Sequence, residues 1–393
     1  MPSDAHPVPS ACAALTHSLN VDPEIERDRS AALRIRQQQD DDHMTRNSMN
    51  SVERVLAALR HQPVDRLPWI EGIVQNGIAT AVCGQRINVD WSVAPDGFPR
   101  QPGAELAAEQ IKVNRVLGKD NVQFSAFAPI FAHKMTPATD GSPVLVGDGM
   151  IKTRAEFDRL FRLPSPEDDA FVHNARQFIA HKEDYCSCAC VRLGIGATLL
   201  SMGIEAFSYA MADDPQLITD VHNEYADWTA RVVPVLEDLG FDVIWAFDDV
   251  AFNSGPVFSP DFYREYILPR ERLVTERFSQ PLITHSDGDM NPLLTDWLSL
   301  GQQAIHPIQP DVMDIGQVKR QYGERVCLVG NIFMDDLIHR TPADIEAQVL
   351  ERIRIAGAGG GYILSSSNSL TDPMKPENIL AIRAAIDAWG PGA

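Results

Sequence analysis

The chain has 393 residues, of which 44% are hydrophobic, so one large α/β domain with extensions can bury a sizeable core. Acidic residues outnumber basic ones by 54 to 34, and the net charge of −20, without any Lys/Arg-rich block, excludes nucleic acid and anionic membrane surfaces as expected partners. Six cysteines are too few for a disulfide scaffold, and no stretch has the pattern of a membrane span or secretory signal, so we expect a soluble cytoplasmic protein.

Residues 1–48 differ in composition from the rest of the chain. They are rich in Asp, Arg, Gln, Ser and Pro, and they include the run QQQDDD at 37–42. Such a segment cannot bury enough apolar surface to offset the entropy lost on ordering. We therefore expect a disordered leader. After it, the sequence predicts a helix from Val52 to Leu59, with Ser51 capping its first turn.

From there to residue 390, short apolar runs alternate with longer amphipathic segments. The runs predict eight strands: 67–71, 122–130, 186–193, 243–247, 282–285, 303–306, 326–330 and 362–365. Helices are expected at 154–182 in pieces, 203–239, 260–279, 291–300, 314–322, 341–357 and 376–388. Strand followed by helix, repeated along the chain, predicts a single parallel (β/α)8 TIM barrel over 51–390, with a hairpin inserted at 143–153.

Polar residues stand where these strands end, which is where a TIM barrel places its catalytic groups. In chain order they are Glu71, His133, Arg192, Asp248, Asp249, His285, Asp287, His306, Asn331 and 366–368. Unrelated surface positions would seldom all hold residues that can bind ligands or transfer protons. Their presence at successive strand ends therefore indicates one functional site.

His285 and Asp287 lie two positions apart, on the same face of an extended segment. They are candidates for a metal site or for acid/base chemistry, and the alternative is a simple hydrogen-bonded pair. Adjacent residues face opposite ways, so only one of Asp248 and Asp249 is expected in the pocket. We favour Asp248, whose pKa would rise on burial and suit it to acid/base catalysis.

The remaining candidates are weaker when taken singly. Glu71 is a third metal ligand, a substrate anchor, or the partner of a barrel arginine such as Arg192. His306 is a ligand or a core histidine, and the amides of Asn331 and Asn368 orient a substrate or cap a loop. We assign Glu71, Arg192, His306, Asn331 and Asn368 to substrate binding.

Cys186, Cys188 and Cys190 alternate along one predicted strand and therefore share a face. Three positions spread along a strand are poorly placed to converge on one metal ion. We expect small packing residues on a face that helices cover.

Several motifs carry a resemblance to a known family. They are PDFYREYILP at 260–269, HSDG at 285–288, the stretch from Gly301 to Pro307, VGNI at 329–332 and PEN at 376–378. Over roughly residues 51–390 the chain resembles the uroporphyrinogen decarboxylase superfamily. The resemblance implies a (β/α)8 barrel that often pairs as a homodimer. It also implies one of two activities, because the family contains true decarboxylases and a branch of corrinoid-dependent methyltransferases.

Decarboxylases of the family carry a segment like RQAGRY after the first strand, whose arginines hold the substrate carboxylates. This chain has LPWIEGIVQ at 67–75 instead, and no arginine occurs between Arg66 and Arg86. This difference argues against porphyrinogen decarboxylation.

The methyltransferase branch carries His-x-Cys after the fifth strand and a second cysteine after the eighth, which together bind zinc. Here the first motif is His285-Ser286-Asp287, and Asn368 stands near the position of the second cysteine. Both thiolates are replaced, so the ligands offered are nitrogen and oxygen only. Such a site suits zinc held weakly, a harder divalent ion, or no ion.

The resemblance and this replacement predict methyl transfer or demethylation of a small methylated substrate, for example a methoxy compound. The expected acceptor is a corrinoid protein, because the chain has no cobalamin-binding module that we recognise. Two alternatives stay open: a carboxy-lyase that acts on a smaller acid through Asp248, and a non-catalytic barrel that binds a small molecule.

Overall fold

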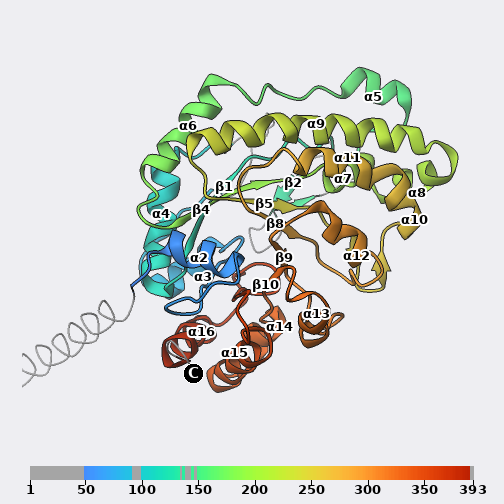
Figure 1. Ribbon diagram of the computed structural model, residues 1–393. Coiled ribbons are helices and arrows are strands. Elements are labelled where there is room, and N and C mark those ends of the chain that lie inside the picture. Colours follow the sequence, from blue (N-terminus) through green and yellow to red (C-terminus); the bar gives the residue numbers. More distant parts are fainter. Residues whose placement is uncertain (1–47, 91–98, 133–134, 138–142, 146–147, 390–393) are drawn as a thin grey trace, which may run out of the picture. The chain divides into compact units, whose positions relative to one another are not determined.

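The computed structural model describes residues 48–90, 99–132, 135–137, 143–145 and 148–389 (Figure 1). The residues from Met49 onward form one unit. The expected disordered leader, apart from Ser48, and the candidate His133 lie outside the described residues, so both stay predictions.

The centre of the fold is a curled sheet of seven parallel strands in the order β1-β4-β5-β8-β9-β10-β11 (Figure 1). Their bounds are Asn121–Ser125 for β1, Cys186–Val191 for β4, Val243–Phe247 for β5, Leu282–His285 for β8, Ala304–His306 for β9, Cys327–Val329 for β10 and Tyr362–Ile363 for β11. Each strand pairs in parallel with its neighbour, and the register sets His285 beside both Phe247 and His306. The parallel α/β architecture expected from the sequence is confirmed, and the strand ends meet at one edge.

The first expected strand, 67–71, does not form as a strand. Trp69 makes a single parallel bridge to Leu364, and its carbonyl accepts a hydrogen bond from the Asp120 N–H. On one side, the Ile70 N–H donates to the Leu364 carbonyl at 3.0 Å and the Leu364 N–H donates to the Pro68 carbonyl at 2.9 Å. On the other side, side chains take part: the Trp69 N–H donates to the Asp120 carboxylate and the Glu71 N–H to the Asn121 amide oxygen, each at 3.0 Å. Because side chains of Asp120 and Asn121 replace regular strand pairing on the β1 side, the main sheet of the described residues has seven strands rather than eight.

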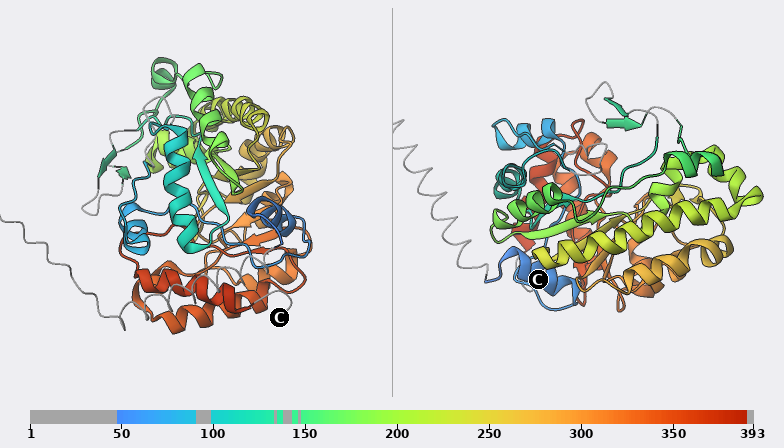
Figure 2. Two further views of the ribbon diagram at one scale, coloured as in Figure 1. Left: turned by 90° about the vertical axis from the view of Figure 1, so that its left-hand side faces the viewer. Right: turned by 90° about the horizontal axis from the view of Figure 1, so that it is seen from above.

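Helices pack against the outside of the sheet (Figures 1 and 2). Those expected from the sequence are α2 (Ser51–Leu59), α5 (Arg154–Leu160), α6 (Asp169–Ala180), α8 (Ile204–Asp213), α9 (Pro215–Leu239), α10 (Pro260–Phe262), the π-helix η1 (Tyr263–Ile267), α11 (Leu268–Thr275), α12 (Leu294–Trp297), the 3-10 turn η2 (Leu298–Leu300), α13 (Ile315–Tyr322), α15 (Pro342–Ala356) and α16 (Pro376–Trp389). Four helices were not expected: α3 (Asn76–Cys83), α4 (Gly103–Leu117), α7 (Ile195–Met202) and α14 (Met334–His339).

Two local expectations need correction. Helix α2 is capped by Asn50, not Ser51: the Asn50 side chain accepts from the Glu53 N–H, while the Glu53 carboxylate accepts from the Asn50 N–H. The hairpin is formed by β2 (Met135–Pro137) and β3 (Pro143–Leu145), not by 143–153, and it lies apart from the main sheet in both views of Figure 2.

The two faces of the sheet have separate cores. Outward residues such as Phe124, Ile244 and Leu328 pack against the surrounding helices. The inner face is a second cluster in which alternate strand residues, among them Trp245 and Ile283, pack with α2.

Cys186, Cys188 and Cys190 belong to this inner cluster, and all three are buried. They pack as expected, but the face they share is the inside of the curled sheet, which only α2 covers at one end.

Among the described residues, no single helix is long and apolar enough to cross a membrane; α7 and α8 would pass that test only as a pair, and they meet at a bend of 104°.

Candidate functional site

A cavity of about 270 Å³ opens where the strands end, on the inner side of the sheet. The described residues that line it are Ile73, Gln123, Ser125, Phe127, Cys190, Arg192, Gly196, Leu199, Leu200, Phe247, Asp249, His285, Asn368 and Ser369. They come from β1, β4, β5 and β8 toward their carboxyl ends, from helix α7, and from the segments that follow residues 67–71 and β11. This is the expected position for a site in this type of fold.

Three ionisable side chains meet at this cavity. Asp249, His285 and Asp287 each offer a ligand atom, and these atoms lie within 4.8 Å of one another. The His285 Nε2 atom is 3.3 Å from an Asp249 oxygen and 3.8 Å from an Asp287 oxygen. The His285 side chain is only 6% exposed, whereas the Asp287 side chain is 31% and the Asp249 side chain 63% exposed. The imidazole is therefore buried, and the two carboxylates reach solvent.

Asn368 completes this group. Its amide donates a hydrogen bond to Asp287 Oδ2, so these two predicted site residues lie in contact. The other Asp287 oxygen, Oδ1, is shielded from solvent and has no hydrogen-bond partner among the described residues. A buried carboxylate oxygen without a partner is costly.

Behind His285 runs a buried chain of hydrogen bonds. The Nδ1 atoms of His285 and His306 are 2.7 Å apart, and His306 Nε2 lies 3.2 Å from Ser365 Oγ and 3.3 Å from the Ser366 carbonyl. Because that carbonyl can only accept, the network assigns the His306 proton to Nε2, which leaves Nδ1 to accept from His285. His285 is thereby held with Nε2 toward the cavity.

Glu71 closes this chain at its far end. Its carboxylate accepts from the Ser366 N–H at 2.9 Å, the Ser366 hydroxyl at 2.6 Å and the Trp69 indole at 2.7 Å, and the Ser365 hydroxyl is 3.4 Å away. Glu71 is fully buried and does not line the cavity. Among the described residues it forms no ion pair with Arg192 and is not part of the Asp249–His285–Asp287 cluster, so none of the three arrangements expected for Glu71 is present.

The electrostatics separate the two histidines. Burial lowers the pKa of His285, but the hydrogen bond to Asp249 and the charges of Asp287 and Asp249 raise it overall. Burial and the neighbouring charge of His285 both lower the pKa of His306, which is held well below its usual range. His285 is therefore the member of the pair that takes up a proton more readily, and His306 is the neutral acceptor.

The two aspartates beside His285 respond in opposite directions. Burial raises the pKa of Asp249, but its hydrogen bond to His285 lowers it overall to about 2. Burial raises the pKa of Asp287, and the nearby Asp249 charge adds to that rise, while His285 opposes it. Asp249 is therefore the permanent anion of the cluster.

The expectation that Asp248, rather than Asp249, enters the pocket is wrong. Val243, Trp245 and Phe247 face inward, so the alternation continues to Asp249, and Asp248 points outward. The Asp248 carboxylate instead accepts the backbone N–H groups of Leu193 and Gly196. Burial raises its pKa to about 6 although both hydrogen bonds oppose this, and its partners make it a support for the loop before α7.

The other candidates divide into two groups. Arg192 and Asn368 line the cavity, as expected for substrate-binding residues. His306 and Asn331 do not line it: His306 bonds to His285, and the Asn331 amide donates to the Ile308 carbonyl at 2.7 Å. The cavity residues Gln123, Ser125 and Phe127 were not among the predicted site residues, although alternation along the strand places them on one face.

The cluster fits a divalent metal ion. One imidazole nitrogen and two carboxylate oxygens are a donor set that zinc and harder ions accept, and Asp287 Oδ1 has no hydrogen-bond partner among the described residues.

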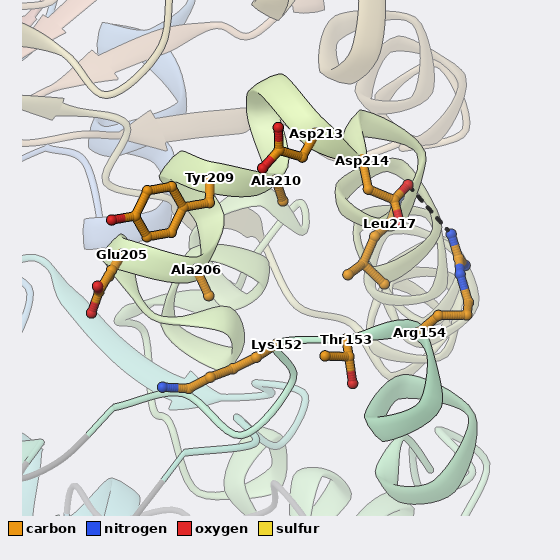
Figure 3. Close-up of a pocket in the computed structure, with 10 residues that line it drawn as sticks. All are labelled: Lys152, Thr153, Arg154, Glu205, Ala206, Tyr209, Ala210, Asp213, Asp214 and Leu217. Atoms are coloured by element: carbon orange, nitrogen blue, oxygen red, sulfur yellow. Dashed lines mark hydrogen bonds and ion pairs between the residues drawn. The ribbon is translucent and has the colours of Figure 1, made fainter.

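A larger cavity, of about 550 Å³, lies on the surface between residues 152–154 and α8 (Figure 3). Arg154 there pairs with Asp214 at 4.0 Å, and Tyr209 on α8 is exposed. This cavity lacks a histidine and lies away from the strand ends that carry the cluster, so we assign the site to the smaller one.

Comparison with known proteins adds the family. The model of the uroporphyrinogen decarboxylase (URO-D) family matches residues 193–389, half of the chain. This chain belongs to the uroporphyrinogen decarboxylase family. The matched region contains Asp249, His285, Asp287 and Asn368, but Arg192 and the strands before it precede the match.

Individual relatives within the family are distant. A uroporphyrinogen decarboxylase from Coxiella burnetii is 26% identical over 156 residues, which cover 37% of this chain and only 40% of that protein. One from Xanthomonas axonopodis pv. citri is 22% identical over 85% of this chain and 97% of its own length.

Among solved structures, a methyltransferase from Methanosarcina mazei has a similar fold. Its TM-score is 0.66 at 19% identity, with 87% of this chain and 99% of that chain covered. This likeness extends the fold beyond the region that the family model matches.

Proposed function

We propose that this protein removes a methyl group from a small methylated substrate, such as a methoxy compound, and passes it to a corrinoid protein. The observation that carries the proposal is the Asp249–His285–Asp287 cluster at the mouth of a small cavity. The fold shared with the methyltransferase from Methanosarcina mazei supports it. The resemblance of His285-Ser286-Asp287 to the zinc-binding His-x-Cys motif of the methyltransferase branch supports the same assignment.

A metal ion would be held by Asp249, His285 and Asp287 together. Bound there, it would supply a Lewis acid for the oxygen that loses its methyl group. Asn368 holds one Asp287 oxygen and leaves the other free, so the ligand atom is oriented before any ion binds.

The protein's own groups act at the same oxygen. When the methyl group leaves, the electron pair of the C–O bond stays on the substrate oxygen, which becomes negatively charged. In the ion-free site, the protonated His285 can donate its Nε2 proton to that oxygen. His306 keeps the imidazole turned toward it, and the apolar walls formed by Phe247 and Leu199 restrict water.

Porphyrinogen decarboxylation fits the site less well. Pockets for drug-sized ligands have volumes of roughly 300–1,000 Å³, and this cavity, at about 270 Å³, is smaller than that range. A tetrapyrrole is larger than a drug-sized ligand, so it would not fit. Arg66, the arginine next to the first strand position, pairs with Asp120 at 2.7 Å and does not line the cavity.

A carboxy-lyase acting on a smaller acid is the second candidate, and the family itself favours it. The route through Asp248 is weakened, because that carboxylate is held by two backbone N–H groups. A lyase would have to use His285 or Asp249 instead.

We also infer that residues 67–71 occupy the eighth position of a (β/α)8 barrel. Their hydrogen bonds reach both Leu364, beside β11, and Asp120, beside β1, which are the two ends of the seven-stranded sheet.

The proposal is tested by incubating the zinc-loaded protein with cob(I)alamin and a panel of methoxy, methylthio and methylammonium compounds. We expect methylcobalamin, detected by absorbance and mass spectrometry, to form with at least one compound, and His285→Ala to abolish it. Carbon dioxide release without methylcobalamin would support the lyase. Neither product from any compound would contradict an enzymatic role for the cluster.

A further inference from the structure

Arg192 is the cationic side chain among the described residues that line the cavity, and it makes no direct ion pair with any of them. It continues the inward alternation of Cys186, Cys188 and Cys190 and lines the cavity. Its guanidinium lies 4.3 Å from the centre of the Phe127 ring, a cation–π contact. In the described part of the chain, no carboxylate forms an ion pair with Arg192, and no hydrogen bond engages its side chain.

Such a cation is costly to keep in a pocket. Removal from solvent lowers the pKa of Arg192, although the charges of Asp248 and Asp249 raise it again, and a guanidinium remains protonated at neutral pH. No described residue accepts a hydrogen bond from its five N–H donors, so they are available to water or to a ligand. A planar carboxylate on the ligand can accept two of these N–H groups at once and balance the charge.

The net charge of the protein makes this local cation informative. At −20, the molecule as a whole repels anions, so an anionic ligand needs a positive group inside the site itself. One guanidinium matches one carboxylate rather than several.

The walls of the cavity define the rest of the ligand. Phe127 and Phe247 stand edge to face, with ring centres 6.3 Å apart and planes at 89°, and Ile73, Leu199 and Leu200 add apolar surface. A cavity of roughly 150 Å³ holds benzene. The volume of about 270 Å³ therefore suits a single aromatic ring with small substituents.

We propose that Arg192 is the carboxylate subsite for a small aromatic acid whose ring lies against Phe127 and Phe247. The identity of the reacting group rests on the proposed function: with methyl transfer, the substrate is a methylated aromatic acid, such as a methoxybenzoate. Arg192 then selects the substrate and does not take part in the chemistry.

Binding of two probes tests this subsite directly. Isothermal titration calorimetry with 4-methoxybenzoate and its neutral isostere 4-methoxybenzamide separates charge from shape. We expect wild-type protein to bind the acid at least about tenfold more tightly than the amide, as one charge-assisted pair provides. Arg192→Gln should remove this preference, while Arg86→Gln, an exposed arginine on the described surface, should retain it.

A second variant guards against misfolding. Arg192→Met keeps an unbranched apolar stem against Phe127, and it should lose the preference in the same way while circular dichroism shows a native fold. Equal binding of acid and amide by wild type, a preference that survives in a folded Arg192 variant, or no binding of either probe would each overturn the proposal.

This test is independent of methyl transfer, because no methyl acceptor is present. If the acid binds through Arg192 but yields no methylcobalamin, the subsite stands and the proposed function fails. If a neutral methoxy compound is demethylated and the acid does not bind, the proposed function stands and the carboxylate subsite fails. Formation of anisole and carbon dioxide from 4-methoxybenzoate would assign the same subsite to a lyase.

Discussion

The imidazole of His306 lies between His285 and Ser365, fully buried and edge-on to Trp245, with ring centres 5.2 Å apart. It contacts no cavity, yet its Nδ1 atom fixes which nitrogen of His285 carries the proton toward the core. Groups that hydrogen-bond a metal-binding histidine commonly set its orientation and basicity. His306 could be predicted from its position at a strand end, but the sequence does not show that the His285 side chain lies between His306 and the cavity.

We predict that His306→Phe weakens zinc binding about 10–100-fold without unfolding the protein. Phenylalanine keeps an aromatic ring against Trp245 but cannot accept from His285, so the imidazole loses its fixed orientation. A competition titration with a zinc chelator measures the effect. The exposed His173→Phe is the matched control, and an affinity equal to that of wild type in His306→Phe would remove the orienting role.

At the scale of secondary-structure elements, Asp248 connects β5 to the loop that begins α7. Its carboxylate accepts hydrogen bonds from the backbone N–H groups of Leu193 and Gly196. These bonds replace the side-chain cap that Gly194, at the start of α7, cannot supply. The sequence located β5 and β8 to the residue, because apolar runs bounded by turns mark both ends. It missed α7, since an apolar helix that directly follows a strand carries no periodic polar face.

We predict that Asp248→Asn lowers the free energy of unfolding by about 1–3 kcal/mol, because the amide can accept at only one oxygen and leaves a buried N–H group without a partner. Urea denaturation measures this loss. Asp261→Asn, whose side chain is 92% exposed, should stay within about 0.5 kcal/mol of wild type. Unchanged stability combined with lost activity would return Asp248 to a catalytic role.

At the scale of the whole molecule, the repeated pattern of strand and helix was enough to predict a parallel α/β fold and the edge where its polar residues gather. It could not predict the side-chain bonds by which Asp120 and Asn121 hold residues 67–71 in place of a regular strand. Nor could it reveal a buried acidic group behind the site. Glu71 and Asp248 could be predicted as site residues because they stand at strand ends. Glu271 lies within helix α11, and only the folded structure shows that it is buried.

Glu271 makes the stability of the fold depend on pH. Burial raises its pKa to about 8, the Asp248 charge adds to that rise, and the hydrogen bond from Tyr263 at 2.7 Å opposes it. The pKa of Glu271 is higher in the folded protein than in the unfolded chain. The contribution of Glu271 to the free energy of unfolding is therefore present in full below about pH 4.5 and is lost as pH rises through about 8.

We therefore predict that Glu271→Gln matches wild type in free energy of unfolding near pH 4.5 and exceeds it at pH 8.5, by on the order of a few kcal/mol. Denaturant titrations at both pH values, with the exposed Glu276→Gln as control, measure the difference. A Glu271→Gln variant that is less stable than wild type at pH 8.5 would contradict a buried neutral acid.

The most direct measurement is the metal content of the purified protein after zinc loading and desalting, for wild type, His285→Ala and Asp287→Ala. If Asp249, His285 and Asp287 form a metal centre, wild type will retain one ion per chain, both variants will lose it, and the exposed Asp261→Ala will keep it. A folded wild-type protein that retains no ion, or variants that bind as wild type does, would contradict the metal centre and leave His285 as an acid/base group alone.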